Sequence, residues 1–305
     1  MRPIYLPGVN AVKDNRLKLI LQYDGSAFHG WQIQRKERTV QGELEAALEQ
    51  LTSTRCPVIG SGRTDRGVHA TGQVAVASLP DTWLPGKLQR ALSAVLPHDI
   101  WIKSVERAAP GFHPRYDAVR RTYLYHLGLS AEAASPFHRH WCWAFAKPVD
   151  IALLESAAEG VVGEHSFKAF AKSGQPERGD ECTVQESTWE PWEKLGITLR
   201  ITANRFLHHM VRYLVGTMVD IARGKRPLED LRSLLLEPES ALRTSPPAPA
   251  TGLFLDHVTY PMQPTTAGKG SPSNARFPRA NPSLQTELSS SLEDRSSSST
   301  EPETS

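Results

Sequence analysis

Eleven consecutive residues from Gly60 to Ala70, GSGRTDRGVHA, hold the side chains best suited to chemistry in this chain. The glycines among them allow positive φ and let another backbone or a ligand come close. Asp65 stands between Arg63 and Arg66, and both cations favour its ionised form. The local chemistry leaves two interpretations open. Asp65 is a carboxylate that faces a substrate, or it caps a helix at a glycine-rich turn while both arginines lie in solvent.

The order of these residues, Gly-Arg-Thr-Asp-x-Gly-Val-His-Ala followed by Gln73 and Val74, resembles the signature of the bacterial tRNA pseudouridine synthase A family. Other segments resemble that family in the same order along the chain. They are YDGSAFHGWQ at 23–32, RTYLY at 121–125, FLHHMVR at 206–212 and GLFL at 252–255. Five ordered motifs of different chemistry are hard to obtain by chance, and the resemblance covers roughly residues 16–261.

The resemblance implies a pseudouridine synthase fold of the α+β class, in which two ferredoxin-like halves join their antiparallel sheets around a central cleft. The N-terminal catalytic half would span residues 16–108 and carry Asp65. The C-terminal half would span residues 109–261 and carry Tyr123 and Arg212. The resemblance also implies a homodimer, in which one subunit binds the tRNA body while the other acts on the anticodon stem-loop.

The activity implied by the resemblance is isomerisation of uridine to pseudouridine in the anticodon stem-loop of tRNA, expected at tRNA positions 38–40. This reaction breaks the C1′–N1 bond, turns the uracil and joins C5 to C1′. It involves no redox change or phosphate transfer, so we expect no metal and no nucleotide cofactor. In the family the aspartate of the motif is catalytic, and it falls on Asp65. Its carboxylate would attack the sugar or the base, or stabilise positive charge at C1′.

Two further residues match the family's active site. Tyr123 would stack on the uracil and shuttle a proton, although an unplaced tyrosine is otherwise read as a core residue. Tyr125 lies two residues on and is expected on the same side. Arg212 would lie opposite Asp65 and hold that carboxylate ionised through a fork-like hydrogen bond. The alternative for Arg212 is a solvated basic helix face.

Substrate binding is expected from cations and one aromatic ring. Arg63 would bind a phosphate or base near the reacting carboxylate, and Arg66 is a weaker candidate because the family pattern leaves its position variable. Trp31 and Arg35 belong to a loop, residues 28–38, that combines an aromatic ring with cations and would wedge beside RNA. A solvated charged loop is the alternative.

His208 and His209 resemble metal ligands only superficially. Both belong to a helix predicted for residues 204–222, which would place Arg205, His208 and Arg212 on one face. Adjacent residues on a helix point about 100° apart, and no histidine or carboxylate stands four residues after either one. We therefore expect packing or RNA contact from both rings, and no metal site.

Hydrophobic spacing predicts strands that alternate with helices in two comparable sets, which favours helices packed on a sheet. Thr39 is a plausible N-cap for the first helix. The expected strands are 17–23, 57–59, 73–79, 101–107, 119–127, 196–203 and 253–260, and the expected helices are 40–51, 84–96, 151–162, 204–222 and 230–236.

Composition describes an ordinary soluble protein. The 305 residues are 39% hydrophobic and carry a net charge of +2, so RNA binding would depend on local basic patches. Three scattered cysteines suggest reduced thiols in a cytoplasmic protein. No apolar run of about 18 residues is present. The N-terminal extension, residues 1–15, lacks the apolar core of a secretion signal. Residues 262–305 are rich in Ser, Pro and Thr and are expected to be disordered.

Three other functions compete with the tRNA enzyme. The first is a pseudouridine synthase that acts on other RNAs, and only a profile of its substrates would distinguish it from the tRNA enzyme. A non-catalytic tRNA-binding protein of the same fold would not need Asp65, Tyr123 and Arg212 together. A nucleotide-binding enzyme would use the glycine-rich loop as a phosphate cradle, yet this loop lacks the Lys-Ser/Thr ending of a P-loop.

Overall fold

A ten-stranded, mostly antiparallel sheet organises the chain in the computed structural model, which describes residues 15–172, 179–237 and 241–261. The strand order is β4-β1-β3-β10-β5-β9-β8-β7, with β2 paired to β3 and β6 paired to β5. The expected disordered tail, 262–305, and all but the last residue of the expected N-terminal extension lie outside the described residues. Among the residues described, no helix is long and apolar enough to cross a lipid bilayer.

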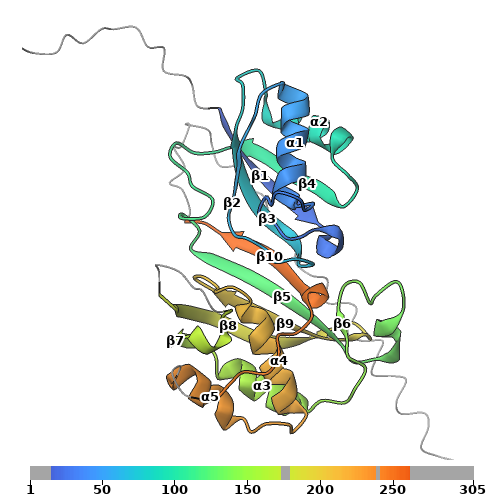
Figure 1. Cartoon of the computed structure of the whole chain (residues 1–305), viewed down its shortest axis with the longest axis vertical. Helices are drawn as coiled ribbons and strands as arrows, with labels where there is room; N and C mark the ends of the chain where they lie inside the picture. The colour runs from blue at the N-terminus through green and yellow to red at the C-terminus, as the bar shows by residue number, and fades with distance from the viewer. Residues whose placement is uncertain (1–14, 173–178, 238–240, 262–305) are drawn as a thin grey trace, which may run out of the picture. The chain divides into compact units, whose positions relative to one another are not determined.

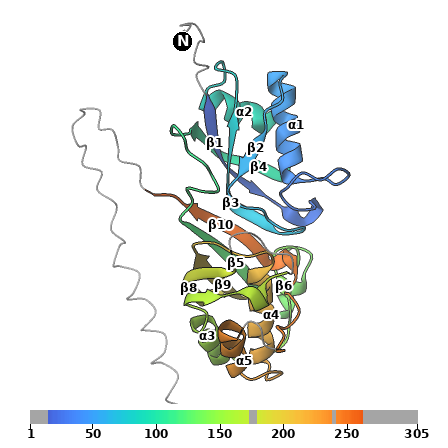
Figure 2. The ribbon, with the colours of Figure 1, turned by 60° about the vertical axis from the view of Figure 1, so that its left-hand side comes forward.

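The strands are β1 (Arg16–Tyr23), β2 (Val58–Gly60), β3 (His69–Ser78), β4 (Ile100–Arg107), β5 (Arg120–Gly128), β6 (Trp143–Ala144), β7 (Gly163–Ser166), β8 (Glu181–Trp192), β9 (Gly196–Ala203) and β10 (Leu253–Thr259). The α-helices are α1 (Val40–Thr52), α2 (Pro85–Val95), α3 (Ile151–Glu159), α4 (Met210–Ala222) and α5 (Glu229–Leu236). Figures 1 and 2 show α1 and α2 beside the first strands, and α3, α4 and α5 beside the later ones.

The last strand, β10, joins the two groups of strands. It pairs parallel to β3 through Phe254 and Leu255, and antiparallel to β5 over most of its length. Figure 1 shows β10 and β5 side by side between the two groups of helices. Leu253 belongs to the buried core under α3, α4 and α5, and Leu255 to the core under α1 and α2. Because these leucines are two residues apart on one strand, both cores lie on the same face of the sheet. The fold is thus the expected α+β class with joined antiparallel sheets.

Most expected elements are present, with ends shifted by a few residues. The predicted N-cap is confirmed, because the Thr39 side chain accepts a hydrogen bond from the backbone N–H of Gly42. The predicted start of the long helix at residue 204 is wrong, since α4 begins at Met210. Strand β8 was missed in the sequence. A register shift between Val184 and Glu186 breaks its alternation of buried and exposed residues, which is the signal that marks a strand.

Candidate active site

The loop that carries Asp65 connects β2 to β3 and is fastened to the strands beneath it. The Ser61 hydroxyl donates to the Gln73 side-chain oxygen at 2.7 Å, and the Gln73 amide donates to the carbonyl of Gly62 at 3.0 Å. The hydroxyls of Thr64 and Tyr23 lie 2.8 Å apart. Burial raises the pKa of Tyr23 to about 12, so its hydroxyl stays protonated. Thr64 thus points inward, while the Asp65 side chain is 19% exposed.

A second segment, residues 24–38, supports the Asp65 loop from the other side. The backbone N–H of Trp31 donates to the carbonyl of Thr64 at 3.0 Å, and the backbone N–H of Gly67 donates to the carbonyl of Phe28 at 3.3 Å. Gly30 has φ +91°, and a Cβ there would lie 2.6 Å from the Thr64 carbonyl oxygen. Only glycine fits this close approach.

Trp31 does not fit the RNA-stacking role expected from the sequence. Its side chain is 2% exposed and belongs to the core under α1 and α2. The ring lies against Gly60, where a Cβ would come 2.6 Å from it. The buried ring leaves no face for a base, so Trp31 holds the Asp65 loop in place instead. Arg35 from the same segment is exposed, as an RNA contact requires.

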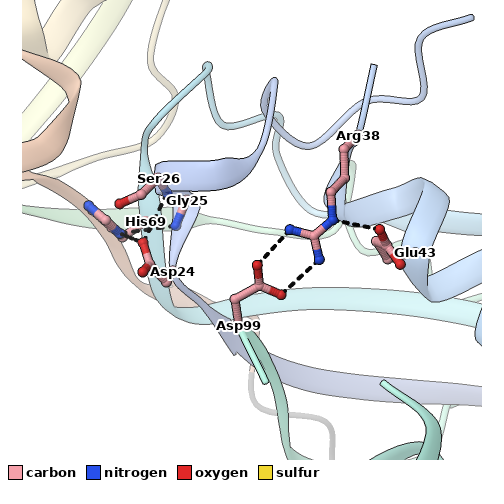
Figure 3. A network of polar contacts seen from close by, with 7 residues as sticks. All are labelled: Asp24, Gly25, Ser26, Arg38, Glu43, His69 and Asp99. Atoms are coloured by element: carbon pink, nitrogen blue, oxygen red, sulfur yellow. Dashed lines mark hydrogen bonds and ion pairs between the residues drawn. The ribbon is translucent and has the colours of Figure 1, made fainter. Parts of the chain in front are cut away.

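Two polar networks fix the ends of this segment (Figure 3). The Arg38 guanidinium donates to both carboxylate oxygens of Asp99, at 2.6 and 3.0 Å, and its Nε donates to Glu43 at 2.7 Å. At the other end, the Gly25 N–H donates to Nδ1 of His69 at 3.0 Å. Burial lowers the pKa of His69, which favours the neutral ring that this acceptor role needs.

Three side chains from α4 and the segment just before it converge on the Asp65 carboxylate. Nε2 of His208 lies 3.2 Å from Oδ1, and Nε2 of His209 lies 3.4 Å from Oδ2. Nη1 of Arg212 lies 4.0 Å from Oδ2. The structure therefore brings Arg212 to Asp65, as the sequence predicted, but at a longer distance than a hydrogen bond.

The expected fork-like hydrogen bond from Arg212 is absent for a local reason. Its Nε donates to the carbonyl of Ala248 at 2.7 Å, which commits one edge of the guanidinium to the backbone. The predicted shared helix face of Arg205, His208 and Arg212 is also wrong. His209 has φ +66°, and α4 begins only at the next residue. Arg205 and His208 therefore precede the helix.

Both histidines were missed as neighbours of Asp65, because the argument from sequence placed them on a regular helix. The positive φ of His209 turns the chain there, so the two rings reach one carboxylate from adjacent positions. Histidine tolerates this conformation better than β-branched residues do, yet nothing in its residue type predicts it. Burial lowers the pKa of His209, while the nearby Asp65 charge acts in the opposite direction.

Tyr123 lies where the two cores meet, packed against both and edge-on to Phe206 with ring centroids 5.0 Å apart. Burial raises its pKa, and the negative charge of Asp65 adds to this effect. The phenol is therefore protonated at neutral pH and can donate a hydrogen bond. Tyr125 points to the same face, as expected, but is fully buried and donates to the carbonyl of Pro249 at 2.9 Å.

Arg63 and Arg66 both lie exposed beside Asp65. The contacts to its carboxylate come from His208, His209 and Arg212 instead of these two neighbours. Neither flanking arginine forms an ion pair with the carboxylate, although the local sequence suggested that both would stabilise its charge. Both lie at the surface next to it.

Comparison with known proteins identifies relatives across most of the chain. The family model described as tRNA pseudouridine synthase matches residues 19–117 and 157–261. The chain is 42% identical over 248 residues to the tRNA pseudouridine synthase A of Maridesulfovibrio salexigens, which covers 80% of this chain and 90% of that protein. It is 38% identical over 249 residues to the protein of the same name from Bacillus subtilis, covering 80% and 99%. The corresponding Chlamydia muridarum protein is 39% identical over 249 residues, covering 80% and 92%.

Proposed function

The chain belongs to the tRNA pseudouridine synthase family, and from this premise we propose that it isomerises uridines of the tRNA anticodon stem-loop to pseudouridine, at positions 38–40. The observation that carries the proposal is the Asp65 carboxylate. It stands partly exposed on a loop fastened from both sides, with two imidazoles and a guanidinium directed at its oxygens. A site of this kind presents one oriented carboxylate to a substrate.

The chemistry requires one bond to break and one to form at the same sugar carbon. The C1′–N1 bond breaks, the uracil turns, and C5 joins C1′; C5 then loses its hydrogen while N1 gains a proton. In the proposed mechanism Asp65 attacks C1′ or the base, or stabilises positive charge at C1′. A target uridine must leave its stacked position to reach this carboxylate, which costs a few kcal/mol.

Tyr123 is proposed to meet the extruded uracil. Its position at the junction of the two cores puts it close enough to Asp65 for the carboxylate charge to act on its pKa. Its protonated phenol can donate a hydrogen bond to the turning base, or give up its proton and take another in return. Arg212 is proposed to keep the carboxylate oriented, through charge more than through a direct hydrogen bond, given the 4.0 Å separation.

RNA binding is proposed to rest on exposed cations near the carboxylate. Arg63, Arg66 and Arg35 are exposed and suit contacts with phosphates. A homodimer is proposed as well, since one subunit can then hold the tRNA body while its partner acts on the stem-loop. A reducing cytoplasmic location agrees with three cysteines that are all free and buried.

Tritium release from unmodified tRNA labelled at C5 of uracil tests this proposal. We expect stoichiometric release, followed by pseudouridine at positions 38–40 when the modified sites are mapped. Release confined to other tRNA positions or to other RNAs would refute the proposed specificity but would still support the isomerase activity. No release from any RNA would refute the proposed activity.

A further inference from the structure

Asp65, His208 and His209 form a triad of metal-ligand types around one point. Their ligand atoms all lie within 4.8 Å of one another. The two carboxylate oxygens lie 3.2 and 3.4 Å from the histidine Nε2 atoms. In tetrahedral zinc sites the ligand atoms lie about 2.0–2.1 Å from the ion, and therefore about 3.3 Å from one another. The two oxygen–nitrogen distances lie near this value, although each histidine faces a different oxygen, and the two histidine ligand nitrogens lie within 4.8 Å of one another. A small rearrangement would place one oxygen and both nitrogens around a single ion.

The backbone explains how two adjacent histidines can serve one point. On a regular helix or strand their rings would diverge, whereas the φ of +66° at His209 turns them together, with ring centroids 4.2 Å apart. His209 is also the N-cap position of α4, so a well-packed helix holds it. The side chains of His208, His209 and Asp65 are 48%, 19% and 19% exposed, which lets an ion enter from solvent.

The ligand set selects among ions. Two imidazoles with one carboxylate suit Zn²⁺, Cu²⁺ and Ni²⁺, whereas Mg²⁺ and Ca²⁺ prefer sites made of oxygen ligands. Three protein ligands leave a fourth position for water, as in open zinc sites. Arg212 opposes binding, because its cationic Nη1 lies 4.0 Å from Oδ2. This repulsion is expected to limit the affinity, so the ion would come and go.

The cysteines offer no competing site. All three are buried and free. Burial raises the pKa of Cys142 and raises that of Cys182 to about 11, which disfavours the thiolates that bind metals. They also lie on different segments, after α1, before β6 and in β8.

We propose that Asp65, His208 and His209 bind a single Zn²⁺ ion, and that the bound ion silences the Asp65 carboxylate. The ion takes the oxygen lone pairs that an attack on substrate needs, and it stands where a substrate atom would approach. The binding half of this proposal depends on geometry alone, whereas the silencing half rests on the proposed function. Zn²⁺ here is an inhibitor and takes no part in the isomerisation.

Calorimetric titration of the full chain, free of any affinity tag and stripped by a chelator, tests the binding half with Zn²⁺ alone. We expect one reversibly bound ion per chain. His208→Gln and His209→Asn are the informative variants, since asparagine tolerates positive φ and keeps the turn. Losing even a supporting neighbour of a metal ligand costs about 10–100-fold in affinity. Each variant should therefore bind Zn²⁺ at least about tenfold more weakly.

His138→Gln is the matched control, because His138 lies 3.9 Å from the Glu132 carboxylate and belongs to no cluster of three metal-ligand side chains among the described residues. It should bind Zn²⁺ like the wild type, and circular dichroism should show all three variants folded. Equal Zn²⁺ affinity in the wild type, His208→Gln and His209→Asn would overturn the site. Mg²⁺ at millimolar concentration should not displace the ion, and displacement would overturn the assignment to a transition metal.

Tritium release at buffered free Zn²⁺ tests the silencing half. The wild-type rate should fall as the calorimetric site fills, and a chelator should restore it. An unchanged rate with the site filled would overturn silencing while the binding site stands. No release in the absence of Zn²⁺ would instead count against the proposed function, and the titration would still decide the metal site.

Discussion

The hydroxyl groups of Tyr23 and Thr64 lie 2.8 Å apart in a buried position, one residue before Asp65. Tyr23 ends β1, whereas Thr64 belongs to the loop between β2 and β3. The contact therefore ties the loop to a strand distant in the sequence. Since Thr64 is directed inward by this bond, the next side chain, Asp65, is directed toward His208 and His209.

Removing either hydroxyl should destabilise the fold and slow turnover. Tyr23→Phe or Thr64→Val leaves a buried polar partner unsatisfied, which costs about 1–3 kcal/mol of unfolding free energy. The double variant should cost less than the sum of the two, because it removes both polar groups. Urea unfolding measures the stabilities and tritium release measures the turnover. Strict additivity of the two single costs would contradict a direct hydrogen bond.

Gly25 should be intolerant of any side chain. A Cβ there would lie 2.0 Å from the carbonyl oxygen of Val68, at the end of the Asp65 loop. Gly25→Ala should therefore cost about 1–3 kcal/mol or more and displace the loop, with loss of tritium release. Gly86→Ala is the control, since nothing lies within 4 Å of that position in α2. It should be neutral or stabilise by up to about 1 kcal/mol.

The sequence predicted most elements of the fold because they carry clear periodicity, as in α1 with its Thr39 cap. It failed where local geometry departs from regular structure. The bulge in β8 disrupts the alternation, and the positive φ at His209 delays the start of α4 to Met210, six residues after the predicted start at residue 204. Asp65 and Arg212 were paired through the family resemblance. The histidine contacts could not be predicted, because they depend on the turn of the chain at His209. The burial of Trp31 could not be predicted either, because it depends on tertiary neighbours that are distant in sequence.

Two arginines of the segment at 24–38 should behave differently when replaced. Arg38→Gln removes the bidentate bond to Asp99 and the bond to Glu43, so we expect a loss of about 1–3 kcal/mol. Arg35→Ala should change stability by less than about 0.5 kcal/mol, because Arg35 is exposed. It should weaken tRNA binding and reduce the salt dependence by about one phosphate contact. Thermal unfolding and filter binding at several salt concentrations measure these effects. The reverse pattern would contradict the assigned roles.

Stability should rise with pH between about 4 and 6.5. Burial lowers the pKa of His126 from 6.5 to about 4, so in this window the unfolded chain binds more protons than the folded one. The effect is at most about 3.5 kcal/mol, since the shift is about 2.5 pKa units and one unit is worth about 1.4 kcal/mol. Urea unfolding at pH 4.5, 5.5 and 6.5 measures it. His126→Gln should show a shallower rise, and an unchanged slope in that variant would argue against His126 as the source.

Single-turnover tritium release by Asp65→Asn and Asp65→Ala tests the central claim most directly. Asparagine keeps the size of the side chain, but it has no carboxylate to act on C1′ or the base. Both variants should bind unmodified tRNA with near wild-type affinity and release no tritium above background, while the wild type releases it fully. Release by Asp65→Asn at a rate close to that of the wild type would show that the reaction does not depend on this carboxylate.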